Sequence, residues 1–95
     1  MQKGSEKDYN TLYDAILCLK TREECNALFE DLFTISELSA AVQRLKVAGM
    51  LYEKQTCNSV AEKTGASTAT VSRVNKCLNY GPGGYKTVLE RLKKK

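Results

Sequence analysis

The stretch that decides the fold is CNSVAEKTGASTATVSRVNK, residues 57–76. Gly65 divides it into two short amphipathic runs, and a sharp turn between two helices needs a residue that can take a positive φ. Val60, Val71 and Val74 are spaced so that both runs can bury one apolar face. Together these features predict a helix-turn-helix, the two-helix unit that places its second helix in the major groove of DNA.

Ser67 marks the start of the second helix, because its hydroxyl can accept a hydrogen bond from a backbone N–H that has no partner inside the helix. Thr64 and Ala66 depart from the usual pattern of this motif, in which a larger apolar residue is more common at either position. The motif is therefore predicted from its glycine, its cap and its valines.

The rest of the chain also has helical periodicity, and no segment alternates with period two. Thr21–Glu24 and Thr34–Glu37 have the pattern of capping boxes, which open helices. GPGG, residues 81–84, ends the helix before it because Pro82 cannot continue a helix. We predict an all-α fold of about six helices, near residues 9–19, 21–32, 36–52, 57–64, 67–78 and 85–94.

Length and composition are those of one soluble domain: 95 residues, 42% apolar and 27% charged. Met1 and the polar residues after it predict a short disordered tail. No membrane span or signal peptide is visible, so we expect a cytoplasmic protein. We predict a single domain over 1–95, with dimerisation helices at about 8–54, the helix-turn-helix at 57–78 and a C-terminal helix at 84–94.

The four cysteines include no C-x-x-C pair, and the chain has no histidine, so the usual zinc arrangements are missing. Their apolar helical context predicts buried free thiols, with metal or redox use as the alternative. Catalysis has no obvious residues either, because the chain also lacks a Gly-rich phosphate loop that follows a strand. We expect no metal and no enzymatic activity.

Charge is unevenly distributed along the chain. Residues 57–95 hold eight Lys or Arg and two Glu, a net +6, whereas residues 1–56 hold seven basic and nine acidic residues, a net −2. A basic half that coincides with the helix-turn-helix suits the neutralisation of DNA phosphates. The alternative is that the final Lys93–Lys95 only improves solubility.

The first three helices carry more apolar surface than one small subunit can easily cover. Such faces tend to pair with a second copy, so we expect a homodimer formed through the N-terminal half. The alternative is a monomer that folds these helices back on its own DNA-binding half.

From about Phe33 to its end, the chain resembles the Trp repressor family, in particular its YerC/YecD-type branch. The resemblance is most specific in AEKTGASTATVSR, residues 61–73, and is supported by EECNALFEDLFTISEL, residues 23–38. It implies an intertwined all-helical homodimer that presents two helix-turn-helix units to successive major grooves, as the Trp repressor itself does.

The DNA-facing residues predicted from this resemblance and from residue chemistry lie in and around the second helix. Short hydroxyls can donate or accept at base edges, and Ala69 can touch a thymine methyl, whereas basic side chains suit phosphates. None is a strong base reader, so we expect modest specificity aided by water and DNA shape. The set is Asn58, Lys63, Ser67, Thr68, Ala69, Ser72, Arg73 and Lys76.

A ligand pocket is also implied by the resemblance, since Thr34, Arg44, Thr70 and Arg73 match residues that line the tryptophan pocket of the repressor. Two guanidinium planes could stack on an indole ring. However, Val74 stands where the repressor has a glycine that admits the ring, and Cys77 stands where it has a serine near the amino group. We therefore predict no cofactor and argue against L-tryptophan, while another small effector stays open.

The predicted function is that of a sequence-specific transcriptional regulator, a repressor that binds double-stranded DNA as a homodimer at a pseudo-palindromic operator. No membrane partner is expected. The alternative is a helix-turn-helix module that binds another protein without sequence-specific DNA binding. That module would keep Gly65 and the valines but would not need the basic half.

Overall fold

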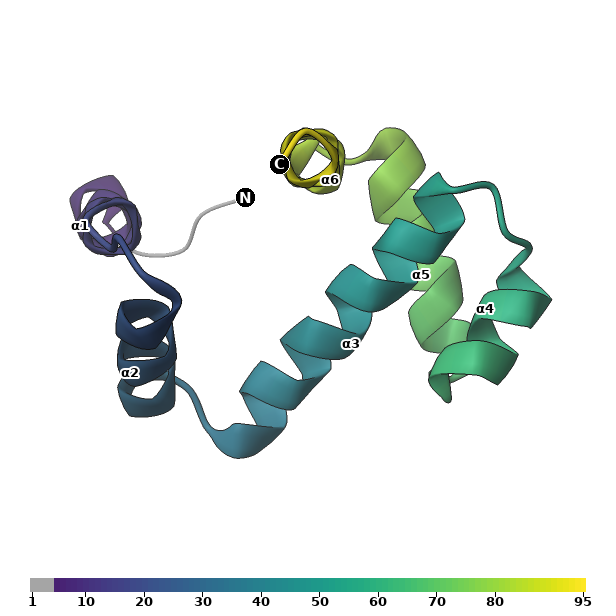
Figure 1. The fold of residues 1–95 in the computed structure, drawn as a ribbon, viewed down its shortest axis with the longest axis horizontal. Coiled ribbons are helices and arrows are strands. Elements are labelled where there is room, and N and C mark those ends of the chain that lie inside the picture. Colours follow the sequence, from purple (N-terminus) through teal and green to yellow (C-terminus); the bar gives the residue numbers. More distant parts are fainter. Residues whose placement is uncertain (1–4) are drawn as a thin grey trace. The chain divides into compact units, whose positions relative to one another are not determined.

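The computed structural model describes residues 5–95, and these residues form helices and no strand. The all-α prediction is confirmed, although the first helix lies slightly nearer the N-terminus than expected. The tail predicted from Met1 onwards begins outside the described residues. The helices are α1 (Glu6–Leu17), α2 (Arg22–Leu32), α3 (Ile35–Tyr52), α4 (Cys57–Thr64), α5 (Thr68–Tyr80) and α6 (Gly84–Lys93), as Figure 1 shows.

The chain divides into two compact units, Met1–Leu38 and Ser39–Lys95. The first contains α1, α2 and the beginning of α3, and the second contains the rest of α3 with α4, α5 and α6. In residues 5–95 no helix has the length and apolar character needed to cross a membrane.

Both predicted capping boxes open helices in the N-terminal unit. The Thr34 and Glu37 side chains each accept the other's backbone N–H, at 3.1 and 2.9 Å. Thr21 accepts the N–H of Glu24 at 3.1 Å, but the Glu24 carboxylate accepts the N–H of Lys20 at 2.7 Å, one residue before the expected donor. Each box satisfies two N–H groups near a helix start, and so fixes where α2 and α3 begin.

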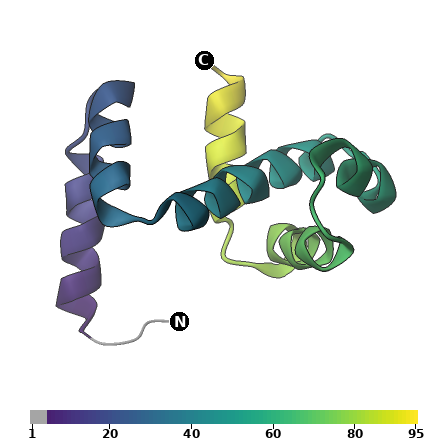
Figure 2. The same cartoon turned by 90° about the horizontal axis from the view of Figure 1, so that it is seen from below.

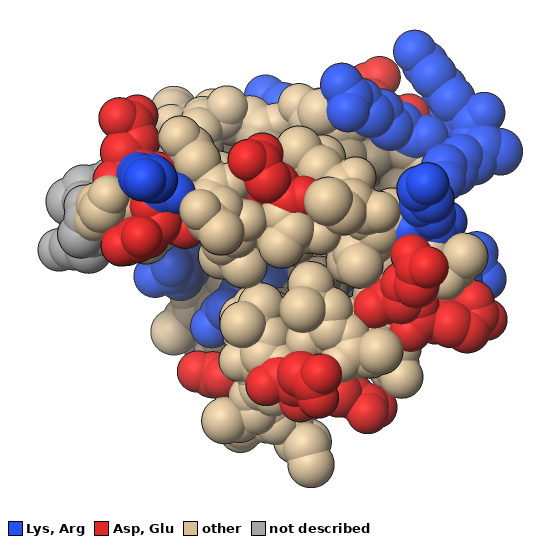
Figure 3. Space-filling model, turned by 90° about the vertical axis from the view of Figure 1, so that its left-hand side faces the viewer, with Lys and Arg blue, Asp and Glu red and all other residues tan. Residues whose placement is uncertain are grey.

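The N-terminal unit leaves much apolar surface uncovered. No residue among 5–38 is buried, and the side chains of Leu17 and Ile35 are 80% and 91% exposed. Figure 3 shows one face of the molecule, where uncharged side chains cover much of the surface. Apolar surface of this kind is usually covered by another molecule.

The core lies in the C-terminal unit, where α3 packs with α4 and α5 (Figure 2). Val60, Val71 and Val74 are at most 1% exposed, which confirms the burial expected for the valines. Tyr85 and Leu89 place α6 against this core. The other buried members are Val47, Ala48, Leu51, Ala66 and Leu78.

The cysteine prediction is half right. All four thiols are free, but only Cys25 is partly buried, and the other three are exposed in the single chain. Cys18 caps the end of α1, Cys57 is the first residue of α4, and Cys77 lies on a side of α5 away from the core. The burial prediction was wrong because helical spacing alone does not show which side of a helix is covered.

Candidate nucleic-acid interface

The turn between α4 and α5 has the backbone expected of a helix-turn-helix. Gly65 has φ 75° and ψ 4°, and its N–H donates to the carbonyl of Ala61 at 2.9 Å. The Thr64 hydroxyl donates to the carbonyl of Val60 at 2.7 Å and accepts the N–H of Ala66 at 3.2 Å. Thr64 therefore satisfies polar groups of the turn, and Ala66 is small enough to be buried there. These two roles explain why neither position holds the larger apolar residue that is usual in this motif.

Ser67 fixes the start of α5. Its hydroxyl oxygen accepts the N–H of Thr70 at 3.1 Å, and its hydroxyl donates to the Thr70 oxygen at 3.0 Å. Thr56 caps α4 in the same way by accepting the N–H of Ser59 at 3.2 Å. Both helices of the motif therefore start at capped, well-defined residues.

The sides of α5 have opposite character. Val71, Val74 and Leu78 face the core, whereas the side chains on the free side are small and polar, or basic. Four predicted DNA-binding residues line one open hollow of about 680 Å³ together with Cys77, and Thr68 is exposed one turn before Ser72. The four are Ala69, Ser72, Arg73 and Lys76.

The other predicted DNA-facing residues do not line this hollow. Asn58 is exposed in the first turn of α4. Lys63 is exposed at the end of α4, and its Nζ donates to Gln55 Oε1 at 3.0 Å. Ser67 serves as the cap of α5. None of these three residues lines the hollow on α5.

The residues predicted for a ligand pocket lie on different elements and in both units. Among the four, only Arg73 lines the hollow on α5. Thr34 belongs to the N-terminal unit, where it caps α3, and Thr70 is engaged with Ser67. Arg44 is exposed on α3.

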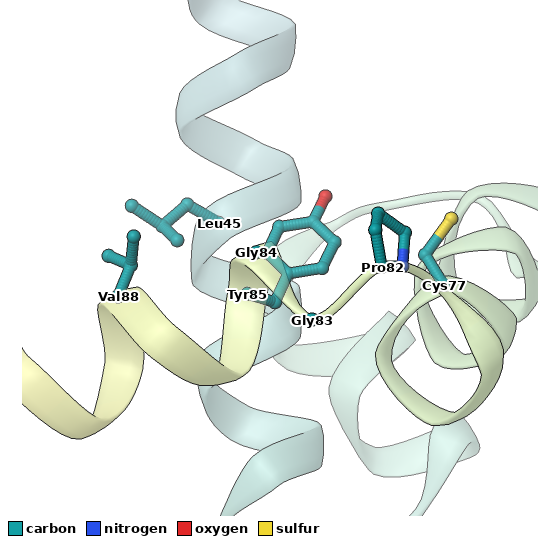
Figure 4. Close-up of a pocket in the computed structure, with 7 residues that line it drawn as sticks. All are labelled: Leu45, Cys77, Pro82, Gly83, Gly84, Tyr85 and Val88. Carbon is teal, nitrogen blue, oxygen red and sulfur yellow. The ribbon is translucent and has the colours of Figure 1, made fainter. Parts of the chain in front are cut away.

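Two further hollows in the C-terminal unit were not predicted from the sequence. One is apolar, about 520 Å³, and lies between α3, α5 and α6 (Figure 4); it is lined by Leu45, Cys77, Pro82, Gly83, Gly84, Tyr85 and Val88. The other is polar and basic, about 470 Å³, and is lined by Leu51, Tyr52, Lys54, Asn75, Leu78, Asn79, Lys86 and Lys93. Both form only when α6 packs back on the core, and sequence periodicity does not show that packing.

One titratable group beside the basic hollow is perturbed. The Tyr52 hydroxyl donates a hydrogen bond to Glu90 Oε2. That hydrogen bond, with desolvation and the negative charges of Glu90 and Glu53, raises the pKa of Tyr52 above its usual 10.0. The phenol is therefore neutral at physiological pH.

Comparison with known proteins gives one consistent result. Residues 7–93 match the family described as Trp repressor protein. The chain is 49% identical over 87 residues to the uncharacterized protein YerC of Bacillus subtilis (strain 168), which covers 92% of this chain and 84% of YerC.

Solved structures agree with this match. A TrpR-like protein from Eubacterium eligens ATCC 27750 is 50% identical with a TM-score of 0.88, over 94% of this chain and 92% of that one. A candidate Trp repressor from Staphylococcus aureus is 40% identical with a TM-score of 0.89, over 96% and 91%. The fold and the order of its elements are therefore those of these proteins.

Proposed function

Since this chain belongs to the Trp repressor family of helix-turn-helix regulators, we propose that it binds double-stranded DNA as a homodimer and represses transcription by occupying a pseudo-palindromic operator. The family is regulatory and not enzymatic. The observation that carries the proposal is the free side of α5, where Ala69, Ser72, Arg73 and Lys76 line one exposed hollow.

The chemistry of α5 suits a groove lined by phosphates. The helix contains Arg73 and Lys76 and no acidic residue. Thr68 and Ser72 can reach base edges with short hydroxyls, while the two basic side chains neutralise backbone phosphates on either wall of the groove. Affinity should then fall with salt, and the log–log slope should lose about 0.9 for each phosphate contact removed.

We propose that the dimer forms through the N-terminal unit. The exposed apolar side chains there, among them Leu17 and Ile35, have no cover in one chain. A two-fold interface would cover them, and helix-turn-helix dimers bind half-sites about one helical turn of DNA apart.

Tryptophan is not part of the proposal. Val74 is 1% exposed and lies within the core, so that side of α5 offers no space for an indole ring. Cys77 is exposed, and its thiol is a weak hydrogen-bond partner for an amino group. DNA binding should therefore be independent of tryptophan.

Selection of bound sequences from a random DNA pool, with and without tryptophan, tests this function. We expect the same pseudo-palindrome to be enriched in both selections. Replacing Thr68 and Ser72 with alanine should relax the sequence preference, whereas R73Q with K76Q should weaken binding to every sequence and flatten the salt dependence. If no sequence is enriched and random duplexes do not bind at low salt, the alternative of a protein-binding module replaces the proposal.

A further inference from the structure

The basic hollow at the end of α5 has the chemistry of an anion site. Three lysines, two asparagines and a tyrosine line it with Leu51 and Leu78, and no carboxylate does. Ammonium and amide N–H groups are donors, so the hollow matches a ligand rich in acceptor oxygens and negative charge, as a phosphate is. An apolar ligand or a metal cation would find few partners there.

Two of the three lysines are available to such a ligand. Lys93 Nζ lies 4.0 Å from Glu53 Oε2 and 5.9 Å from the centre of the Tyr52 ring. The second nearby carboxylate, that of Glu90, accepts a hydrogen bond from the Tyr52 hydroxyl. Within residues 5–95, Lys54 and Lys86 form no ion pair within 4.0 Å, so both ammonium groups are free to bind such a ligand.

Lys54 occupies a backbone position that normally favours glycine. It follows the end of α3 with φ 71°, and among residues 5–95 no other non-glycine residue has a positive φ. The N–H of Lys54 donates to the carbonyl oxygen of Leu51, and the N–H of Gln55 donates to the carbonyl oxygen of Met50. These two hydrogen bonds close the end of α3. A side chain is disfavoured in this conformation, and such positions are often retained for function. Here the disfavoured side chain is a lysine that lines the hollow.

The hollow also continues the DNA-facing side of α5. Thr68, Ser72, Asn75 and Asn79 follow one another at spacings of four, three and four, which places them on one side of the helix. The rise from Thr68 to Asn79 is about 16 Å at 1.5 Å per residue. The major groove is about 12 Å wide, so a helix that reads bases with its first turns meets the phosphate wall near its end.

We propose that this hollow binds a phosphate of the DNA backbone that flanks the bases contacted by α5, with Lys54 and Lys86 as its principal charges. The inference rests on the proposed function and deepens it, because it adds an anchor from the end of α3 and from α6 to the contacts of α5. Asn75 and Asn79 link the two regions, since Asn79 Nδ2 donates to Asn75 Oδ1 at 3.3 Å.

The test is the salt dependence of duplex binding, measured by fluorescence anisotropy for the full chain and for the variants K54G, K86Q and K54G with K86Q. Lys94→Gln is the matched control, because Lys94 is exposed and does not line the hollow. Glycine removes the ammonium while relieving the backbone, so K54G should unfold at the same or higher urea concentration than the wild type. The double variant should bind DNA about five- to tenfold more weakly, with a salt slope shallower by about 0.9 or more, and K94Q should change binding less than about twofold.

The possible results distinguish a failure of the phosphate site from a failure of the proposed DNA binding. A wild type that binds no duplex overturns both. If the wild type binds the duplex and the double variant has the same affinity and salt slope as K94Q, the phosphate site is overturned and the proposed function remains. A second arm adds inorganic phosphate against chloride at matched ionic strength and follows the side-chain amides of Asn75 and Asn79 by NMR. Saturable shifts there, with unchanged DNA binding by the double variant, would assign the hollow to free phosphate and overturn the DNA assignment.

Discussion

Replacing Gly65 with alanine isolates the conformational requirement of the turn. The backbone there has φ 75° and ψ 4°, and a Cβ added at Gly65 would meet no atom within 4 Å. Because no neighbour resists the added methyl group, the whole cost is that of a left-handed backbone for an L-residue. This cost is about 1–2 kcal/mol.

The free energy of unfolding is best measured by urea titration, followed by circular dichroism at one fixed protein concentration because dimerisation adds to the apparent stability. A loss of 1 kcal/mol lowers the melting temperature of a domain this size by roughly 4–8 °C. Gly65→Asn should recover part of the loss, since asparagine tolerates this conformation better than alanine.

Gly84→Ala is the matched control. A Cβ at Gly84 also meets no atom within 4 Å, but this residue opens α6 and has no positive φ. The unfolding free energy of the Gly84→Ala variant should stay within about 0.5 kcal/mol of that of the wild type. A Gly65→Ala protein as stable as Gly84→Ala would refute the left-handed turn, and with it the geometry assigned to the helix-turn-helix.

Three other predictions address the cap, the N-terminal unit and Tyr52. Ser67→Ala should lose about 1 kcal/mol of unfolding free energy, because the N–H of Thr70 loses its acceptor; an unchanged urea midpoint would show that the cap is not needed. Ile35→Glu should shift the protein from dimer to monomer in sedimentation experiments at micromolar concentration, because a charge would replace a 91% exposed apolar side chain at the proposed interface; an intact dimer would place the interface elsewhere. The hydrogen bond to Glu90 raises the pKa of Tyr52 in the folded protein. This hydrogen bond therefore contributes to the free energy of unfolding below pH 10, and the contribution is lost as the pH rises through the raised pKa. Above the raised pKa, the wild type should therefore lose more unfolding free energy than Tyr52→Phe. Equal losses would show that the Tyr52–Glu90 hydrogen bond does not stabilise the fold.

The helix-turn-helix could be predicted because its determinants are local. A glycine at a left-handed position, a serine that caps the next helix and valines at helical spacing each act within a few residues, and the structure has all of them. The capping boxes were predictable for the same reason, although the Glu24 carboxylate bonds one residue earlier than expected.

The basic hollow could not be predicted, because its residues meet only through packing. Lys54 follows α3, Asn75 and Asn79 lie on α5, and Lys86 and Lys93 lie on α6. In the sequence, Lys86 counted only toward the charge of the basic half, and Lys93 also belonged to the terminal lysines that could serve solubility alone. The left-handed backbone at Lys54 also escaped notice, since the usual signal for such a position is a glycine.

The exposure of three cysteines was missed for a related reason. Apolar spacing shows that a helix has an apolar side, but the width of the covered part depends on the neighbouring elements. Cys77 lies outside the part of α5 that α3 and α4 cover, and it lines both the apolar hollow and the hollow of the DNA-facing side.

Amide NMR spectra of the protein titrated with a duplex selected from the random pool test the central claim most directly. We predict that the largest shift changes fall on Thr68, Ala69 and Ser72, with smaller changes at Arg73 and Lys76. Spectra that stay unchanged at low salt, or changes confined to α1 and α2, would contradict the assignment of the free side of α5 to DNA.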